Sequence, residues 1–449
     1  MPNVKDLETQ QKAFDNWRSL VARFGSPLYV YDLDIVEHQV RELKQALPTN
    51  AKVFYSLKAN PLPAIVKTVQ TAGCCLEVCS NHELSVACNS GISIEQILYS
   101  GPGKTTEEIG QAIAIGVNHF SVESYTDLDR LEKAAETAQK SIRLLLRVNP
   151  MEPLQGGLAM SGTPSQFGFE ESVLLNGAQR LSQLSSYVEI IGYHIYYGTQ
   201  IDSEESLIKS FKAGIDCTER LTSQLGFTPQ VIDLGGGFPW PFANQKSAIA
   251  LDNLRFRLEQ LLAQRKYTAE AEIWFESGRY LSASSGTLLA TILDIKPGKF
   301  DSQFVVLDAG INHLGGMSGL GRIPRGYVLM YNLSSEQEAW STETANDGRT
   351  LVVGPLCSPL DCLTRRTELP PSVKINDIVA IPNVGAYGLT ASLVAFLSRP
   401  APLEVSLRNG IPVDLSSLRT GHESLQFLLP EPENLSINIT GDSIHEQYA

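Results

Sequence analysis

The feature that most constrains this chain is a regular alternation of short β-prone runs with amphipathic stretches of helical period. Eight apolar, β-rich runs occur between residues 27 and 280: Val53 to Leu57, Leu76 to Cys79, Ile97 to Tyr99, His119 to Val122, Ile142 to Val148, Val188 to Tyr193, Val231 to Leu234 and Glu272 to Phe275. Between them lie helical stretches such as Leu33 to Leu47, Pro63 to Ala72, Thr106 to Gly116 and Tyr125 to Ala138. This alternation predicts parallel strands joined by helices. It is typical of a TIM-type (β/α)₈ barrel, although a doubly wound open sheet would alternate similarly.

The pattern changes near Thr287, where helical stretches become rare. Strand-like runs with short turns follow at Leu288 to Ile295, Phe304 to Leu307, Thr350 to Val353, Ile378 to Ile381 and Leu403 to Leu407. We therefore expect an α/β chain with a second, mostly antiparallel β domain. The expected limits are 1–26 for an N-terminal arm that packs with the β domain, 27–280 for the barrel and 281–449 for the β domain. A turn-rich loop is expected at 149–166, a polar insertion at 332–349 and a further strand at 425–429.

Composition excludes several classes of function. The net charge of −13 and the absence of a basic stripe argue against binding to nucleic acid. No apolar segment follows a basic start, and no apolar run approaches the ~20 residues that span a bilayer, so we expect a cytoplasmic protein without membrane contact. The seven cysteines are an odd number in a long chain, which argues against a disulfide framework as the basis of the fold. No paired Cys-x-x-Cys or histidine completes a metal site, so no metal is expected.

The first barrel run ends in a lysine. In Val53-Phe54-Tyr55-Ser56-Leu57-Lys58-Ala59-Asn60-Pro61 a buried strand delivers Lys58 to a turn. Desolvation disfavours the ammonium form, so the amine of Lys58 is expected to lose its proton more easily than in water. That makes Lys58 a candidate for Schiff-base chemistry. A lone lysine at a strand end is otherwise an ordinary side chain that reaches into solvent.

Two other strand ends supply complementary groups. The seventh run is followed by Gly235, Gly236 and Gly237, and the eighth by Glu276, Gly278 and Arg279. Taken alone, the glycines could be a flexible turn, and Glu276 with Arg279 a local ion pair. Loops after strands 7 and 8 are, however, the usual phosphate site of a (β/α)₈ barrel. A lysine for an aldehyde, a phosphate cradle and an acid for a pyridine nitrogen together predict pyridoxal 5′-phosphate as cofactor.

The motifs and their order resemble the ornithine, arginine and diaminopimelate decarboxylase branch of the pyridoxal-phosphate enzymes with the alanine-racemase-like fold. The resemblance covers nearly the whole chain. It rests on Gly25 to Asp32, Tyr55 to Asn60, Ser100 to Lys104, Leu234 to Phe238, Glu276 to Tyr280, Gly354 to Cys357 and Gly385 to Gly388.

The resemblance implies a role for each residue. Lys58 forms the aldimine with the cofactor, and Glu276 pairs with the pyridine nitrogen. Gly235, Gly236, Gly237, Gly278, Arg279 and Tyr387 bind the phosphate, and Thr199 also contacts the cofactor. Cys357 is the acid near Cα and reaches in from the partner subunit of a homodimer, so that the active sites lie at the interface.

The chain departs from the family pattern at several positions. Tyr196 stands where a histidine usually stacks on the cofactor ring, and His194 either fits the preceding histidine position or is a core histidine. Ser358 follows Cys357, where relatives place an acid for the distal ammonium of the substrate. Asp361 lies nearby and could compensate, and Arg279 is a further candidate substrate contact. The small-residue run 314–319 replaces a motif for the distal carboxylate. The simplest interpretation is a substrate without a distal ammonium and a roomier pocket.

These features most resemble the carrier-protein-linked glutamyl decarboxylase of butirosin biosynthesis and its relatives. We predict a decarboxylase of an amino acid, plausibly one tethered to an acyl carrier protein or otherwise modified, in natural-product biosynthesis. A diaminopimelate decarboxylase of lysine biosynthesis and a non-catalytic regulator of the same fold stay open as alternatives. An amino-acid racemase is disfavoured, because that group usually pairs the pyridine nitrogen with arginine and this chain has Glu276.

Overall fold

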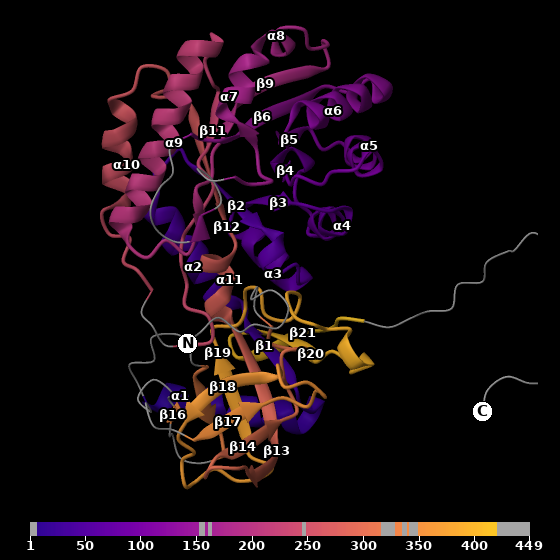
Figure 1. Ribbon diagram of the computed structural model, residues 1–449, viewed down its shortest axis with the longest axis vertical. Helices are drawn as coiled ribbons and strands as arrows, with labels where there is room; N and C mark the ends of the chain where they lie inside the picture. The colour runs from indigo at the N-terminus through magenta and orange to yellow at the C-terminus, as the bar shows by residue number, and fades with distance from the viewer. Residues whose placement is uncertain are drawn as a thin grey trace, which may run out of the picture.

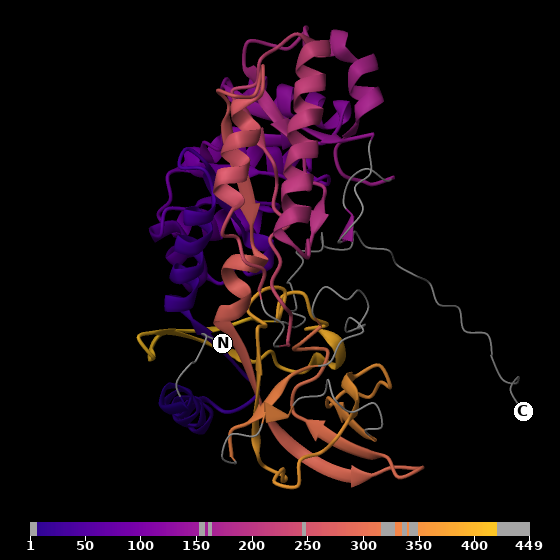
Figure 2. The ribbon, with the colours of Figure 1, turned by 90° about the vertical axis from the view of Figure 1, so that its left-hand side faces the viewer.

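The computed structural model describes residues 7–151, 158–159, 164–244, 248–315, 328–334, 339–340 and 349–419. The chain forms a (β/α)₈ barrel and a second, mostly antiparallel sheet, which lie at the top and bottom of Figure 1. Figure 2, turned by a quarter, shows the same two parts with the short helix α11 (Arg279–Ser282) at their junction. Both predicted architectures are therefore confirmed.

The barrel is a closed ring of parallel strands. Its eight members are β2 (Lys52–Ser56), β3 (Cys75–Val78), β4 (Ile97–Tyr99), β5 (His119–Val122), β6 (Ile142–Asn149), β9 (Val188–His194), β11 (Val231–Asp233) and β12 (Glu272–Ser277). Each strand coincides with one of the eight predicted runs. The ring closes because β12 pairs with β2 and β5 pairs with β6. Closure excludes the doubly wound open sheet that the alternation alone left possible.

Helices cover the outside of the ring. They are α2 (Leu33–Ala46), α3 (Pro63–Thr71), α4 (Asn81–Asn89), α5 (Thr106–Ile115), α6 (Tyr125–Ala138), α7 (Glu171–Asn176), α8 (Ala178–Leu181), α9 (Glu204–Leu225), α10 (Leu254–Ala263) and α11. Short elements near the strand ends are β7 (Leu158–Ala159), β8 (Phe169–Glu170), β10 (Gly198–Thr199), η1 (Leu57–Ala59), η2 (Ile94–Gln96) and η3 (Ala283–Ser285). Four of these helices begin at a residue whose side-chain oxygen accepts a backbone N–H of the first turn: Ser80, Thr105, Ser124 and Ser203. Each cap fixes where the preceding loop ends and the helix begins.

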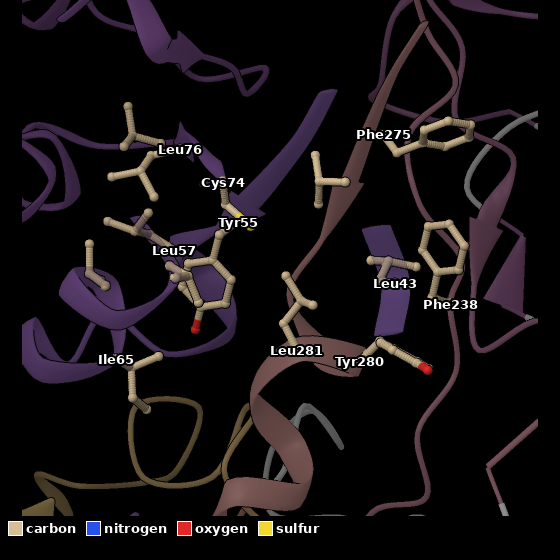
Figure 3. Close-up of a cluster of buried hydrophobic side chains, with 14 of the residues drawn as sticks. Leu43, Tyr55, Leu57, Ile65, Cys74, Leu76, Phe238, Phe275, Tyr280 and Leu281 are labelled. Carbon is tan, nitrogen blue, oxygen red and sulfur yellow. The ribbon is translucent and has the colours of Figure 1, made fainter. Parts of the chain in front are cut away.

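Two layers of apolar side chains hold the barrel together. One layer lies between strands and helices; Figure 3 shows part of it, with Tyr55 of β2, Phe275 of β12 and Leu43 of α2 among the labelled side chains. The other is a separate buried cluster made of one residue from each of seven barrel strands, among them Phe54 and Trp274, whose ring centroids are 4.6 Å apart. Because neighbouring residues of a strand point to opposite faces, these side chains fill the inside of the ring.

The second sheet contains β1 (Leu28–Asp32), β13 (Gly286–Pro297), β14 (Gln303–Leu307), β15 (Met330–Asn332), β16 (Ala339–Trp340), β17 (Thr350–Val353), β18 (Cys362–Thr367), β19 (Ile378–Pro382), β20 (Leu403–Arg408) and β21 (Ile411–Ser417). The five predicted runs are present as β13, β14, β17, β19 and β20. Most pairs are antiparallel, and β14 with β17 and β1 with β20 are parallel. The short helix η4 (Phe396–Ser398) precedes β20.

Strand β1 belongs to the second sheet although it falls within the expected barrel segment 27–280. Its two partners in the described part of the chain are β13 and β20, and both belong to the second sheet. The helix α1 (Leu7–Phe24) precedes it, and Phe14 and Leu20 of this helix share a buried cluster with Leu289 and Val405 of the sheet. The second sheet therefore draws its strands from both ends of the chain.

Some expectations concern residues outside the described ranges. Most of the predicted loop 149–166 and insertion 332–349, and the whole of the predicted strand 425–429, lie there. Within the described residues, no helix combines the length and the apolar character that a membrane span requires.

Candidate functional site

Most of the predicted site residues gather in one pocket where the barrel strands end. Nine of them line it together: Lys58, Tyr196, Thr199, Gly236, Gly237, Glu276, Gly278, Arg279 and Tyr387. Tyr387 comes from the second domain, and its backbone N–H donates to the carbonyl oxygen of Ala59 over 2.7 Å. The pocket is therefore built from the ends of four barrel strands, β2, β9, β11 and β12, and one segment of the β domain, as the strand-end positions predict.

Lys58 faces a buried carboxylate that the sequence did not identify. Its Nζ lies 3.2 Å from Oε1 of Glu77, whose side chain is 1% exposed while that of Lys58 is 47% exposed. Burial acts to lower the pKa of Lys58, but Glu77 and its neighbours outweigh it and the pKa is raised well above its ordinary value. We expected the amine of Lys58 to lose its proton easily, and this is wrong for the protein without its cofactor, because the anion next to Lys58 stabilises the ammonium form.

Glu77 is held by several donors at the end of β3. Its Oε1 accepts bonds from the thiol of Cys79 over 3.1 Å and from the hydroxyl of Ser100. Burial opposes ionisation of Glu77, but Lys58 and these hydrogen bonds lower its pKa to about 2. Ser100 opens the Ser-Gly-Pro-Gly-Lys motif, so this motif serves the lysine indirectly by fixing its counter-ion.

A second buried group of ionisable side chains lies behind the pocket. It consists of His194, Asp233 and Glu276, which each place one ring nitrogen or carboxylate oxygen within 4.8 Å of the others. The Nε2 atom of His194 is 3.7 Å from Oε1 of Glu276. Burial, then the charges of Glu77 and Asp233, raise the pKa of Glu276. Burial and the charge of Arg147 lower the pKa of His194. A neutral histidine therefore stands beside a carboxyl group that tends to keep its proton.

The glycine loop after β11 has little room for side chains. A Cβ on Gly236 would lie 2.1 Å from the carbonyl oxygen of Glu276, and Gly237 has a φ of +99°. Asp233 shapes the start of this loop, because its Oδ1 accepts the backbone N–H of Gly235 over 2.8 Å. Such a loop brings backbone N–H groups close to a bound anion.

Arg279 provides positive charge at the same place. Its guanidinium lies 4.7 Å from the ring centre of Tyr387, and burial lowers its pKa. The Nε of Arg279, the hydroxyl of Ser277 and Oε1 of Glu276 are buried and have no hydrogen-bond partner among the described residues. Buried polar atoms normally have partners, so these atoms fit a ligand that carries both an anionic group and a ring nitrogen.

The position of Tyr196 agrees with the predicted stacking role but does not test it. A Cβ on Gly235 would lie 2.5 Å from Cδ2 of Tyr196, so the tyrosine packs on the glycine loop while it lines the pocket. His194 is 1% exposed, and its Nδ1 is 2.9 Å from the hydroxyl of Ser121. It lies behind Glu276 rather than among the lining residues, which favours the core position for His194.

Three predicted residues lie apart from this pocket. Cys357, Ser358 and Asp361 belong to a loop of the β domain between β17 and β18, and none of them lines the Lys58 pocket of the same chain. Cys357 is exposed, while Ser358 accepts the N–H of Leu360 over 3.2 Å through its hydroxyl. A second cavity of about 640 Å³ lies beneath this loop, and Leu356, Ser358 and Arg365 are among its lining residues.

The expected substrate role of Asp361 is not supported. Its side chain is buried, and its two carboxylate oxygens accept the backbone N–H groups of Ile311 and Leu356 over 2.8 and 2.7 Å. Each carboxylate oxygen is engaged by a backbone N–H, and the side chain is only 2% exposed, so the orientation of Asp361 serves the fold rather than presenting the carboxylate to a substrate ammonium. The sequence placed an acid near Cys357 correctly but could not indicate that it points inward.

Glu77 and Asp233 were missed as members of the site. Both are acids within otherwise apolar runs, Cys74 to Cys79 and Val231 to Leu234. A charged residue is rarely buried without a partner, so an acid near the end of a predicted barrel strand was a usable signal.

Comparisons with known proteins agree with this geometry. Residues 33–283 match the family model described as "Pyridoxal-dependent decarboxylase, pyridoxal binding domain". The chain is 32% identical over 395 residues to the L-glutamyl-[BtrI acyl-carrier protein] decarboxylase of Niallia circulans, covering 87% of this chain and 91% of that protein. It is 30% identical to the diaminopimelate decarboxylase of Aquifex aeolicus, covering 88% and 89% of the two chains.

A solved structure has the same architecture. The diaminopimelate decarboxylase from Helicobacter pylori, complexed with L-lysine, superposes with a TM-score of 0.75 at 25% identity, covering 89% of this chain and 95% of that chain. The family model spans more than half of the chain, and both curated relatives span most of it. The chain thus belongs to the pyridoxal-dependent decarboxylases and is a carboxy-lyase that uses pyridoxal 5′-phosphate.

Proposed function

We propose that this enzyme decarboxylates an amino acid that is carried as a thioester on an acyl carrier protein. The observation that carries the proposal is the loop around Cys357. Ser358 stands where relatives of the diamine-accepting type place an acid, and both oxygens of Asp361 are bonded to backbone N–H groups. Asp361 is the one acid of residues 354–362, and its oxygens are engaged by the fold, so no carboxylate stands next to Cys357 for a distal ammonium. Binding a buried charge without its partner costs roughly 2 to 5 kcal/mol.

Two further observations support a tethered substrate. The relative from Niallia circulans is by its name a decarboxylase of a carrier-bound glutamyl group. The cavity of about 640 Å³ next to the Cys357 loop has a volume typical of ligand sites, and its lining combines apolar residues with the cationic Lys296 and Arg365 and the carboxylate of Asp361. The two cations are suitable partners for the phosphodiester group of a long, flexible linker.

Within the Lys58 pocket, each residue has a proposed task. Lys58 binds the cofactor through its amine, and the backbone of Gly235 to Gly237 and Gly278 holds the phosphate together with Arg279. Tyr387 and Thr199 complete the phosphate site, and the ring of Tyr196 packs on the face of the cofactor. The bound cofactor supplies the electron sink that accepts the electron pair left behind by CO₂.

Glu276 sets the protonation of that sink. Its raised pKa lets the free carboxyl group hold a proton, which it can donate to the ring nitrogen of the cofactor. An ionised Glu276 beside a protonated ring nitrogen would be stabilised by the opposite charge, which offsets the cost of burying the carboxylate. Cys357 then delivers a proton to Cα after CO₂ has left.

We further propose that Cys357 acts across the interface of a homodimer. Its loop lies away from the Lys58 pocket of its own chain, so a partner subunit would bring the two together. Mixing Lys58→Ala protein with Cys357→Ala protein should then restore roughly a quarter of the activity, because heterodimers contain one intact site. If no activity returns although subunit exchange is verified, each chain builds its own site.

The substrate is tested by measuring CO₂ release from glutamyl carrier protein, free glutamate, lysine, ornithine and diaminopimelate in parallel. Lys58→Ala protein is the control for release that does not depend on the site. We expect turnover of the carrier-bound substrate, and we expect Ser358→Asp to improve turnover of a diamine by supplying an acid at the family position. Turnover of diaminopimelate alone would contradict the proposal and favour the lysine-pathway alternative, for which the relative from Aquifex aeolicus speaks.

A further inference from the structure

Asp361, the last residue of the loop that carries Cys357, is hydrogen-bonded to the first residue of the same loop. The backbone N–H of Gly354 donates to the carbonyl oxygen of Asp361 over 3.2 Å, and the N–H of Asp361 donates to the carbonyl oxygen of Ser358 over 3.1 Å. The side chain of Asp361 adds a bond from the N–H of Leu356, the residue directly before Cys357. Cys357 is therefore the exposed tip of a loop whose base is tied at one carboxylate.

The same carboxylate also ties the loop to the sheet. Strands β14 and β17 run parallel, with Val306 opposite Val353, and residues just beyond their carboxyl ends lie side by side. Oδ1 of Asp361 accepts the N–H of Ile311 from the segment after β14, over 2.8 Å. One buried side chain thus joins the loop after β17 to the segment after β14.

Two glycines leave the space for this carboxylate. A Cβ on Gly310 would lie 2.2 Å from Oδ1 of Asp361, and a Cβ on Gly354 would lie 2.4 Å from its Oδ2. Any larger residue at either position would displace the carboxylate from the two N–H groups. Burial raises the pKa of Asp361 overall, and the two backbone bonds oppose this by stabilising the carboxylate.

We propose that Asp361 is a positioning residue, which holds Cys357 at the place where it protonates the substrate carbon. This role rests on the proposed function of Cys357. Asp361 does not touch the substrate; it acts through the N–H of Leu356 and thereby fixes the backbone one residue before the thiol. Ser358, on the other side of Cys357, is fixed by its own bonds to Leu356 and Leu360, so the thiol has little freedom except rotation of its side chain.

The test is a double-mutant cycle on the dimeric, cofactor-loaded enzyme. Asp361→Asn keeps the shape but presents an NH₂ group to one of the two backbone donors, so one bond is lost. We expect kcat to fall about tenfold or more with KM and cofactor content unchanged, because only delivery of the proton is impaired. In a Cys357→Ala background the same substitution should have no further effect on kcat.

A matched control separates positioning from general damage to the domain. Asp377 is another carboxylate of the β domain whose Oδ2 accepts a backbone N–H, that of Lys374, and it also bonds Asn332. Asp377→Asn should lower thermal stability by loss of its own hydrogen bonds but leave kcat within about twofold. Equal losses of kcat in both variants, or additive losses with Cys357→Ala, would overturn the proposal.

The outcomes distinguish this proposal from the proposed function. If Cys357→Ala has full activity, the role of Cys357 is wrong; if it is impaired but Asp361→Asn is not, only the positioning role is wrong. Should Asp361→Asn fail to fold, amide hydrogen exchange of the unsubstituted enzyme decides. Slow exchange at Leu356 and Ile311 is required, and fast exchange at Leu356 would overturn the proposal.

Discussion

Replacing Glu77 by glutamine tests how the pocket controls the charge of Lys58. At the observed 3.2 Å, two unit charges interact by about 1 kcal/mol in a water-like medium and by about 5 kcal/mol at an effective dielectric constant near 20. Glu77 is buried but Lys58 is 47% exposed, so solvent screens the pair in part. We therefore expect the substitution to remove roughly 2 to 3 kcal/mol of favourable interaction with the ammonium form, so that the pKa of Lys58 falls.

The pKa of Lys58 can be measured without the cofactor. Cofactor-free protein is labelled with a trace of acetic anhydride from about pH 7 to about pH 12, and the Lys58 peptide is quantified by mass spectrometry. In Glu77→Gln protein the midpoint should move down, and capture of added pyridoxal phosphate at neutral pH should become faster, because more of the amine is unprotonated.

Glu83→Gln is the matched control for this measurement. Glu83 is a carboxylate on the neighbouring helix α4 that accepts the N–H of Cys79, and the main charge acting on Lys58 is Glu77 rather than Glu83. Its substitution should move the midpoint much less. An unchanged midpoint in Glu77→Gln, or an equal shift in both variants, would refute the assignment of Glu77 as the counter-ion of Lys58.

Three other predictions concern stability and cofactor binding. Burial raises the pKa of Glu404 to about 7. Its contribution to the free energy of unfolding is therefore most favourable below the pKa of this group in the unfolded chain, and it is lost as the pH rises through 7. In urea unfolding, Glu404→Gln should remove roughly 3 kcal/mol of this pH dependence. Gly236→Ala, whose Cβ would meet the carbonyl oxygen of Glu276, should weaken cofactor binding by about 5- to 150-fold in equilibrium dialysis, whereas Gly103→Ala, which has open space, should not. Tyr196→Phe should retain the cofactor and Tyr196→Ala should lose about tenfold in affinity, and equal affinities would refute stacking.

Local sequence signals were sufficient for the barrel. Each of the eight predicted runs is a strand because a parallel strand buried on both faces is a continuous apolar run, which stands out against the amphipathic helices. Since functional groups of such a barrel follow strand ends, the positions of Lys58, Gly236 and Glu276 in sequence were enough to bring them together.

The same reasoning could not predict contacts between segments that are far apart in the sequence. Strand β1 reads like any apolar run, and only its partners β13 and β20 assign it to the second sheet. Asp361 reads as an acid near Cys357, and its inward direction depends on N–H groups of two different loops. The charge of Lys58 was inferred from burial alone, whereas the electrostatic effect of Glu77 reverses the direction. A one-dimensional pattern records which groups are near a strand end but not which of them face each other.

The two domains meet at the loop that carries Lys58, and this has a thermodynamic consequence. Asn60 donates to the carbonyl oxygen of Gly385 over 2.8 Å, and Tyr387 donates its N–H to Ala59 over 2.7 Å. The part of the pocket where Tyr387 packs against Arg279 is thus formed only when the β domain is docked on the barrel. A ligand that binds only the docked form stabilises it by an amount that grows with the logarithm of ligand concentration over Kd. Cofactor binding and domain docking must therefore reinforce each other, and substitutions at Asn60 should weaken cofactor binding although its side chain is bonded to the β domain.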